Sequence, residues 1–200
     1  MVIIGTGGIA KDMIGSMTRD LRNSMFYFYN DKIEDTDTLF FNKFPIIKTK
    51  EALIEHFKTH ENGFVTAIAN PLVRHRMNNK ITEWGGVMTN VIAKKGCIVS
   101  EFAMLSNGII IQPGSIISGN VFLGEGVFVN SGVIIGHDAK IEKYCSFGPG
   151  VRVLGGVSIG EYSYIGCNAV IMPGVKIGSK VRIGIGKIID KDVPDNSKII

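Results

Sequence analysis

The feature that most constrains this chain is an apolar residue at every sixth position from Ala93 to Ile183. All sixteen positions in this register are apolar, and no insertion interrupts them. A second register, four residues later, is mostly small or β-branched until Lys187. An amphipathic helix needs spacings of three and four, and an exposed strand alternates by two, so neither explains a period of six.

A period of six fits a short strand followed by a turn, and three such units close one coil of a parallel β-helix. Aliphatic side chains then stack inside the coil on residues eighteen positions away, and glycines occupy the corners. The 25 glycines of the chain follow no Gly-X-Y repeat, which excludes collagen. At ~4.8 Å between stacked strands, about five coils make a prism roughly 25 Å tall. We therefore predict a mainly β protein.

Residues 1–86 lack this period and predict a small α/β, Rossmann-like domain ahead of a β-helix domain at residues 87–200. Strand-like and helix-like stretches alternate there, which indicates a parallel sheet. Asn70 and Pro71 are typical of a helix N-cap and first turn. The expected elements are a strand at Val2–Ile4, a helix from the glycines to about Leu21, strands at Met25–Tyr29 and Phe44–Ile47, a helix at Lys50–Phe57, a strand at Phe64–Ala69 and a helix towards Trp84.

Two segments of this first domain are candidates for holding a phosphorylated ligand. Gly7 and Gly8 follow the first strand, where backbone N–H groups at a helix start could receive a phosphate. A tight turn without a ligand fits the same residues. Asp31, after the second strand, could bind a ribose or sugar hydroxyl, or it could simply begin a polar loop.

His137 is the only histidine within the repeats, and its hexapeptide places it at a turn. Eighteen residues further on lies Gly155, and then Pro173. The neighbouring column consists of Asp138 followed by two glycines, so the surface beyond His137 has almost no side chains. A narrow pantetheine arm could lie there, with its thioester near the imidazole.

The residues at this turn suit acyl transfer. An imidazole can remove a proton from an attacking amine or hydroxyl near neutral pH. The N–H of Gly155 could stabilise the developing oxyanion, and Asp138 could orient the imidazole. A solvated His-Asp turn on a purely structural β-helix is the alternative. Cys97 and Cys145 are interior fillers by register, and His56, His60 and His75 lie in polar stretches where we expect them to be solvated.

Composition excludes several other classes. A net charge of +4 without a Lys/Arg run gives no indication of nucleic-acid binding. No stretch reaches the ~18 apolar residues of a membrane span, and the N-terminus has no signal-peptide pattern. Three cysteines without CxxC spacing are typical of free thiols, so we expect a cytoplasmic protein.

With its α/β domain, its repeats and its His-Asp turn, the chain resembles the nucleotide-sugar acetyltransferase family that includes PglD and the NeuD-type sialic acid O-acetyltransferases, within the hexapeptide-repeat superfamily. The resemblance covers nearly all 200 residues. It is carried by Ile4–Lys11, Asn30-Asp31, Ala67–Asn70, Ile135–Asp138 and Asp192–Asn196. It implies a left-handed β-helix, acetyl-CoA as co-substrate, no metal, a nucleotide-sugar for surface glycan synthesis, and a homotrimer with the cofactor between neighbouring prisms.

The resemblance also implies roles for individual residues. The implied catalytic base is His137, with Asp138 as its partner; cofactor contacts would come from Ser146, Gly155 and Cys167, and nucleotide-sugar contacts from Gly7, Gly8, Asn30 and Asp31. The chain departs from the family pattern at three of its positions. Ile9 replaces a common histidine, Asn30 replaces the first acid of an Asp-Asp pair, and Ser146 stands where some relatives have a second histidine.

Four functions compete at this stage. The leading hypothesis is N-acetylation of an amino-sugar carried on a nucleotide, and O-acetylation of a sugar hydroxyl would use the same base. A γ-type carbonic anhydrase shares the prism but needs three metal-binding histidines, whereas the repeats contain one. A non-catalytic scaffold or sugar-binding protein is the fourth.

Overall fold

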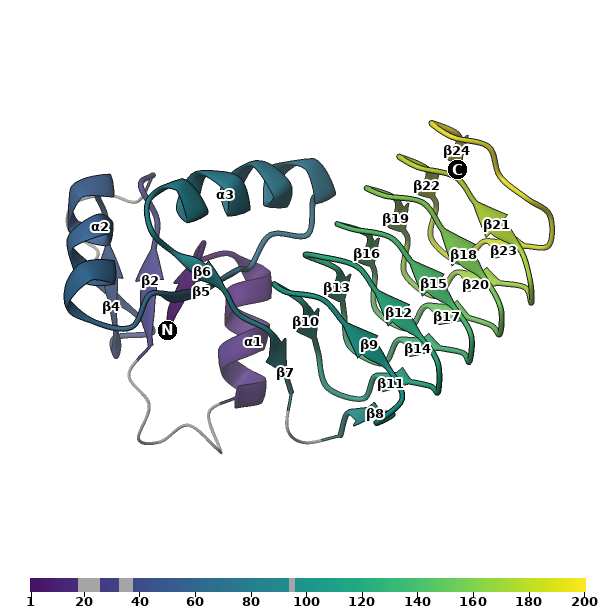
Figure 1. Cartoon of the computed structure of the whole chain (residues 1–200), viewed down its shortest axis with the longest axis horizontal. Coiled ribbons are helices and arrows are strands. Elements are labelled where there is room, and N and C mark those ends of the chain that lie inside the picture. The colour runs from purple at the N-terminus through teal and green to yellow at the C-terminus, as the bar shows by residue number, and fades with distance from the viewer. Residues whose placement is uncertain (18–25, 33–37, 94–95) are drawn as a thin grey trace.

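A computed structural model describes residues 1–17, 26–32, 38–93 and 96–200. An α/β domain stands at one end of a long parallel β-helix (Figure 1). The elements of the α/β domain are β1 (Val2–Ile4), α1 (Gly8–Met17), β2 (Tyr27–Tyr29), β3 (Leu39–Phe40), β4 (Phe44–Ile47), α2 (Lys50–Thr59), β5 (Gly63–Thr66), α3 (Pro71–Glu83) and β6 (Val87–Met88).

These strands form one sheet in the order β3-β4-β2-β1-β5-β6, which is parallel apart from the β3–β4 pair. The predicted α/β class is thus confirmed. Helix α1 packs on one side of the sheet through Met13 and Ile14, whereas Leu53 of α2 and Ile81 of α3 pack on the other. Apolar burial on both faces explains why a sheet of such short strands is stable.

The boundaries of the expected elements differ in places. Helix α1 ends at Met17, and the expected continuation to Leu21 lies outside the described residues, as does Met25 of the second strand. Strands β3 and β6 were not predicted because two residues carry no periodicity. The predicted cap of α3 is confirmed, since Asn70 Oδ1 accepts hydrogen bonds from the N–H groups of Leu72 and Val73 at 3.1 and 3.2 Å.

The β-helix consists of two-residue strands that pair with strands one coil away. Typical pairs are Ile117 with Ile135 and Leu123 with Ile141, each eighteen residues apart, which confirms the predicted register. The strands are β7 (Val91–Ile92), β8 (Ile98–Val99), β9 (Met104–Leu105), β10 (Ile110–Ile111), β11 (Ile116–Ile117), β12 (Phe122–Leu123), β13 (Phe128–Val129), β14 (Ile134–Ile135), β15 (Lys140–Ile141), β16 (Ser146–Phe147), β17 (Arg152–Val153), β18 (Ser158–Ile159), β19 (Tyr164–Ile165), β20 (Val170–Ile171), β21 (Lys176–Ile177), β22 (Arg182–Ile183), β23 (Ile188–Ile189) and β24 (Lys198–Ile199).

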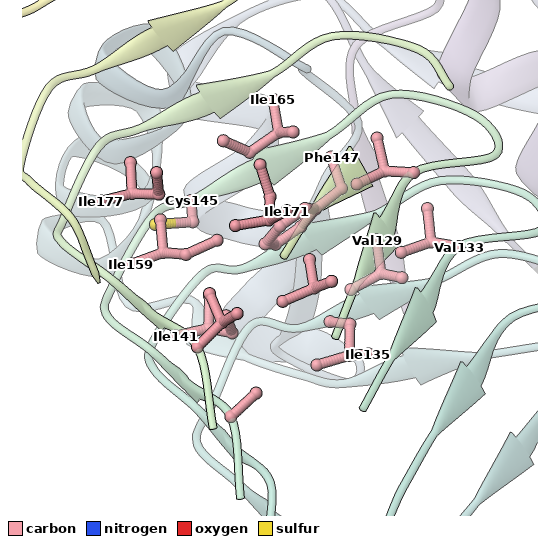
Figure 2. Packing of buried hydrophobic residues seen from close by; sticks show 14 of the residues in the cluster. Val129, Val133, Ile135, Ile141, Cys145, Phe147, Ile159, Ile165, Ile171 and Ile177 are labelled. Atoms are coloured by element: carbon pink, nitrogen blue, oxygen red, sulfur yellow. The ribbon is translucent and has the colours of Figure 1, made fainter. Parts of the chain in front are cut away.

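Three sheets form the sides of the prism. The first face is β7-β10-β13-β16-β19-β22-β24, the second is β8-β11-β14-β17-β20-β23, and the third is β9-β12-β15-β18-β21. Figure 2 shows part of the apolar cluster inside the prism, to which Ile135, Ile141 and Phe147, each the second residue of its strand, contribute. Burying one such aliphatic side chain contributes about 1.5–3 kcal/mol, so the stack is the main source of stability.

Cys97 and Cys145 contribute to this interior, as the register predicts. The thiol of Cys145 donates to the carbonyl of Gly160 at 3.1 Å, and burial raises its pKa to about 12. Burial also raises the pKa of Cys97. Because a nucleophilic cysteine must be a thiolate, both residues are inert packing groups.

The α/β domain stands on the first coils of the first face. Outward-pointing Ile110 and Phe128 of this face are buried in one apolar cluster with Met13 of α1. Higher on the same face, Arg182 of β22 is exposed. No helix within the described residues is long and apolar enough to cross a membrane.

Candidate functional site

His137 and Asp138 form the turn between β14 and β15, at the corner where the second and third faces meet. Backbone bonds from the coils on either side hold this turn. Asp138 N–H donates to the carbonyl of Gly119 at 3.2 Å, and Gly156 N–H donates to the carbonyl of His137 at 2.8 Å. Asp138 has φ +60°, a conformation that Asp tolerates better than most residues.

The imidazole of His137 is in contact with the carboxylate of Asp138, with Nδ1 and Oδ2 2.7 Å apart. Both side chains are exposed, at 74% and 54%. With Asp138 ionised, Nδ1 carries the proton and donates it to the carboxylate, so Nε2 is the free base. The predicted pairing of these adjacent residues is therefore present in the structure.

Asn120 is a third member of this group that the sequence did not single out. Its Nδ2 donates to Asp138 Oδ1 at 2.7 Å. The hydrogen bond from Asn120, followed by that from His137, lowers the pKa of Asp138. The signal for this contact was present in the chain, because Asn120 lies eighteen residues before Asp138 and so directly beneath it.

The imidazole lies on the backbone of Gly155. A Cβ built on Gly155 would be 2.6 Å from both Cε1 and Nε2 of His137. The φ angle of Gly155 is not in the left-handed region, so glycine is needed here for space and not for conformation. Within the described residues, the Gly155 N–H donates to no backbone or side-chain acceptor.

The surface beyond the imidazole is open. We call Gly155, Gly156 and Gly174 the bare ledge, because they present only backbone along this corner. A Cβ on Gly174 would meet nothing within 4 Å, and one on Gly156 would meet only the Gly174 Cα at 4.0 Å. The ledge can therefore receive a narrow chain that hydrogen-bonds to peptide groups.

Two of the expected cofactor contacts lie elsewhere. Ser146 is fully buried on the first face, where its Oγ donates to the carbonyl of Ala69 at 2.7 Å and accepts from Arg74 at 2.8 Å. Cys167 is half-buried in the turn between β19 and β20, at the corner of the first and second faces. One copy of the chain thus brings together His137, Asp138 and Gly155, and not these two residues.

Arg74 of α3 is a buried residue that sequence reasoning missed. Its guanidinium contacts backbone of both domains. No local pattern marks such an arginine, since its burial depends on how the two domains dock.

The residues expected to hold a nucleotide-sugar gather at the carboxyl edge of the sheet. Asn30, after β2, donates through Nδ2 to Thr6 Oγ1 at 2.7 Å and accepts from Lys32 N–H at 3.0 Å. Gly7 and Gly8 are exposed at the start of α1, with nothing within 4 Å of a built Cβ. The glycine-rich loop is therefore joined to the end of the second strand through the hydrogen bond of Asn30 to Thr6 and through the Gly5 N–H, which donates to the Tyr29 carbonyl at 2.9 Å.

Asp31 lies in a cluster of charged and aromatic groups at this edge. Its carboxylate is 3.8 Å from Lys80 Nζ, and this ammonium is 4.7 Å from the centre of the Trp84 ring. Burial, followed by the Asp31 charge, raises the pKa of Tyr29 to about 12. Asp31 is exposed in a turn, so both interpretations, a contact to a sugar hydroxyl and the start of a polar loop, fit its position.

Two of the three histidines outside the repeats are less solvated than expected, whereas His60 is exposed as expected. His56 is 8% exposed and packs on Tyr27 at 4.3 Å between ring centroids, so its expected solvation is wrong. The reason is that α2 turns His56 towards the sheet beside Leu53. His75 is half-buried and its Nδ1 is 3.2 Å from the hydroxyl of Tyr162. Within the described ranges, no three His, Cys, Asp or Glu side chains are grouped so that they could hold a metal ion.

Profiles of two protein families match the chain. The PglD N-terminal domain matches residues 1–81, and the bacterial transferase hexapeptide (six repeats) matches residues 120–155. The comparison with curated proteins gave no match.

Several solved structures share the fold over nearly the whole chain. One is a variant of perosamine N-acetyltransferase from Caulobacter crescentus in which asparagine replaces one histidine, solved with CoA and GDP-perosamine. It is 27% identical, with 98% of this chain and 91% of that chain covered and a TM-score of 0.87. The acetyltransferase domain of PglB from Neisseria gonorrhoeae FA1090, solved with acetyl coenzyme A, is 24% identical, with 98% and 93% covered and a TM-score of 0.86. WeeI from Acinetobacter baumannii AYE is 23% identical, with 98% and 94% covered and a TM-score of 0.87.

Proposed function

We propose that this chain is a PglD/NeuD-like hexapeptide-repeat acetyltransferase, which transfers an acetyl group from acetyl-CoA to the amine of a nucleotide-linked amino-sugar. The matches of residues 1–81 to the PglD N-terminal domain and of residues 120–155 to the transferase hexapeptide support this proposal. The observation that carries the proposal is the placing of the His137 imidazole, paired with Asp138, directly on Gly155 beside the bare ledge. The product would serve surface glycan synthesis, and acetyl-CoA use and free thiols fit a cytoplasmic enzyme.

The reaction uses three groups of this chain. Nε2 of His137 takes a proton from the amine as its nitrogen attacks the thioester carbonyl, and the new C–N bond forms. The free N–H of Gly155 donates to the oxyanion of the tetrahedral intermediate. The C–S bond then breaks, and the imidazolium returns its proton to the departing thiolate of coenzyme A. Asp138 keeps the imidazole in the tautomer that this sequence of steps requires.

Acetyl-CoA would approach along the bare ledge. A pantetheine arm carries amide groups that can hydrogen-bond to the exposed peptide groups of Gly155, Gly156 and Gly174, and no side chain obstructs it there. The contact through Cys167 stays a prediction. Ser146 is fully buried, and its hydroxyl already donates to Ala69 and accepts from Arg74, so we assign it a different role below.

A homotrimer completes the site in this proposal. The α/β domain covers the first face, whereas His137 lies at the opposite corner of the prism, between the second and third faces. The acceptor-binding residues of one copy therefore face away from its own imidazole. A nucleotide-sugar held by one copy would have to react at His137 of the partner subunit, with acetyl-CoA between the two prisms.

The second face supports this assembly, because its outward side chains form an apolar stripe. Ile98 and Ile188 at its two ends are 63% and 69% exposed, and Ile116, Ile134 and Val170 lie between them. Arg152 of β17 interrupts this stripe between Ile134 and Val170. An otherwise apolar surface that contains an arginine is typical of a protein interface.

The proposal is tested by incubating the purified protein with acetyl-CoA and nucleotide-linked 4-amino or 3-amino sugars while free coenzyme A thiol is measured. We expect thiol release that depends on the amine, and a trimer by sedimentation. Release with hydroxyl acceptors only would establish O-acetylation, which the same base can perform. If acetyl-CoA neither bound nor raised the melting temperature, the protein would be a scaffold and the proposal would be wrong.

A further inference from the structure

Arg74 is a fully buried cation that contacts both domains at once. It extends from α3, whose N-terminal half lies beside the first coils of the β-helix (Figure 1). Its hydrogen bonds run from Nε to the carbonyl of Gly126 at 2.8 Å, from Nη1 to the carbonyls of Ile68 and Ala69 at 2.7 and 3.0 Å, and from Nη2 to the carbonyls of Tyr144 and Cys145 at 3.1 Å each and to Ser146 Oγ at 2.8 Å.

All of these hydrogen-bond partners are neutral oxygens. Burial lowers the pKa of Arg74 to about 10, so the guanidinium remains charged at neutral pH. A buried charge without an ionic partner is tolerated only when its donors are satisfied, and six acceptors satisfy the five N–H groups of an arginine. Because these acceptors come from both domains, one relative arrangement of the domains meets the requirement. Arg74 therefore specifies how the α/β domain sits on the β-helix.

The segment that Arg74 holds borders the glycine-rich loop. Ile68 and Ala69 belong to the connection between β5 and α3, at the carboxyl edge of the sheet. A Cβ on Gly5 would lie 3.7 Å from the Ala67 carbonyl and 3.9 Å from Ile68 Cγ1. Ser146 Oγ also donates to the Ala69 carbonyl, so strand β16 and Arg74 hold the same peptide. We call Arg74, Ser146 and the Ala69 carbonyl the interdomain lock.

The part of the site proposed for the acetyl donor, acetyl-CoA, is held independently of the interdomain lock. The turn of His137 and Asp138 lies at another corner of the prism and is fixed by Gly119 and Gly156. Loosening the interdomain lock thus leaves the bare ledge and the catalytic turn in place. What moves is the acceptor loop relative to the β-helix.

We propose that Arg74, with Ser146, is a positioning residue for the acceptor. By fixing the acceptor loop on the first face, the lock sets where a nucleotide-sugar stands in front of His137 of the partner subunit. This inference depends on the proposed function, and it assigns Ser146 to acceptor positioning in place of a contact with coenzyme A. A displacement of about 1 Å in a bound substrate is enough to lower turnover strongly.

The experiment compares Arg74→Lys and Ser146→Ala with the unaltered protein. A lysine keeps the charge, but its ammonium lacks the forked N–H groups with which the guanidinium donates to both domains at once. In Ser146→Ala, Arg74 loses one hydrogen-bond acceptor and the Ala69 carbonyl loses one donor. Arg76→Lys is the matched control, since Arg76 lies on the same helix and is exposed. For each protein, KM and kcat are measured with the nucleotide-sugar varied at saturating acetyl-CoA, and then with acetyl-CoA varied.

We expect Arg74→Lys to raise the KM for the nucleotide-sugar about tenfold or more, and Ser146→Ala to raise it severalfold, with the KM for acetyl-CoA changed by less than about twofold. Arg76→Lys should match the unaltered protein. A lower melting temperature with an unchanged acceptor KM and an unchanged kcat would show a purely structural role and overturn the inference, as would equal changes in the KM of donor and acceptor. Ser146→Ala decides the question if Arg74→Lys does not fold. No transfer by the unaltered protein would refute the proposed function itself.

Discussion

The imidazole of His137 lies so close to the backbone of Gly155 that a single methyl group there would be 2.6 Å from Nε2. Gly155→Ala should therefore displace the imidazole from the attacking amine and also alter the oxyanion donor. The backbone of Gly155 can accept alanine without strain, so the fold should persist. We expect kcat/KM to fall by about 10²-fold or more, measured by thiol release.

The control is Gly119→Ala, one coil beneath His137. Its backbone is equally permissive, and a Cβ there would be 3.8 Å from Ser100 Oγ, which is an ordinary contact. Activity close to that of the unaltered protein is expected. If both alanine variants lost activity alike, the contact between His137 and Gly155 would not be the cause.

Removing the base itself gives a second prediction. His137→Ala should lower kcat by about 10²-fold or more, because the other basic group of this turn, the Asp138 carboxylate, has a lowered pKa and is a much weaker base than an imidazole. The side chain is 74% exposed, so the variant should keep its melting temperature and its oligomeric state. Full activity in a well-folded variant would remove His137 from the mechanism.

The contact between Asn120 and Asp138 predicts a pH effect. The hydrogen bond from Asn120 is the main cause of the lowered pKa of Asp138, so the carboxylate stays ionised to a lower pH than usual. Asn120→Ala should raise this pKa towards the ordinary value of an aspartate, so the carboxylate should be lost at a higher pH on the acid side of the kcat/KM profile, with little change above about pH 5. Asn196→Ala is the control, because Asn196 has a similar φ of +61° against +56° for Asn120 but lies in the last coil. A pH profile of Asn120→Ala that superimposes on that of the unaltered protein would contradict the role of Asn120 in keeping Asp138 ionised.

The β-helix and the geometry of the catalytic turn could be predicted from the sequence because both follow from the six-residue repeat, three of which make one coil of eighteen residues. Each interior position must be apolar, so the period of six was visible without any structure. Counting eighteen residues from His137 then placed Gly155 against it, and the same count from Asp138 finds Asn120. The parallel pairing of Ile117 with Ile135 confirms that this repeat holds across the prism.

The rest depends on contacts between residues with no fixed spacing. Arg74 and Ser146 lie 72 residues apart, and only the docking of two domains brings them together. Ser146, for which the resemblance implied a contact with the cofactor, could not be recognised as an interdomain residue from its neighbours in the sequence. The solvation of His56 was predicted wrongly for a related reason. The polar residues of α2 concealed which side of the helix faces the sheet.

Two adjacent residues of β15 test the interior of the prism. Ile141 is fully buried, and Ile141→Asp would place a carboxylate among aliphatic side chains without a partner. We expect loss of cooperative unfolding or of soluble protein. Lys140 points outward on the same strand, and Lys140→Asp should unfold at nearly the unaltered temperature. Thermal unfolding followed by circular dichroism compares the two variants, and equal behaviour would contradict the assignment of inside and outside.

His56 makes the stability of the α/β domain depend on pH. Its ring stacks on that of His60, with centroids 4.6 Å apart, and packs on Tyr27. Burial, followed by the charges of His60 and the N-terminal ammonium, lowers the pKa of His56 below its usual value. The unfolded chain therefore binds the proton more readily than the folded one, so the free energy of unfolding decreases as pH falls through about 6.5. The melting temperature should drop between about pH 7 and about pH 5, and His56→Phe, which retains a ring against Tyr27 but cannot titrate, should flatten that slope. Equal slopes for the two proteins would show that another group causes the acid sensitivity.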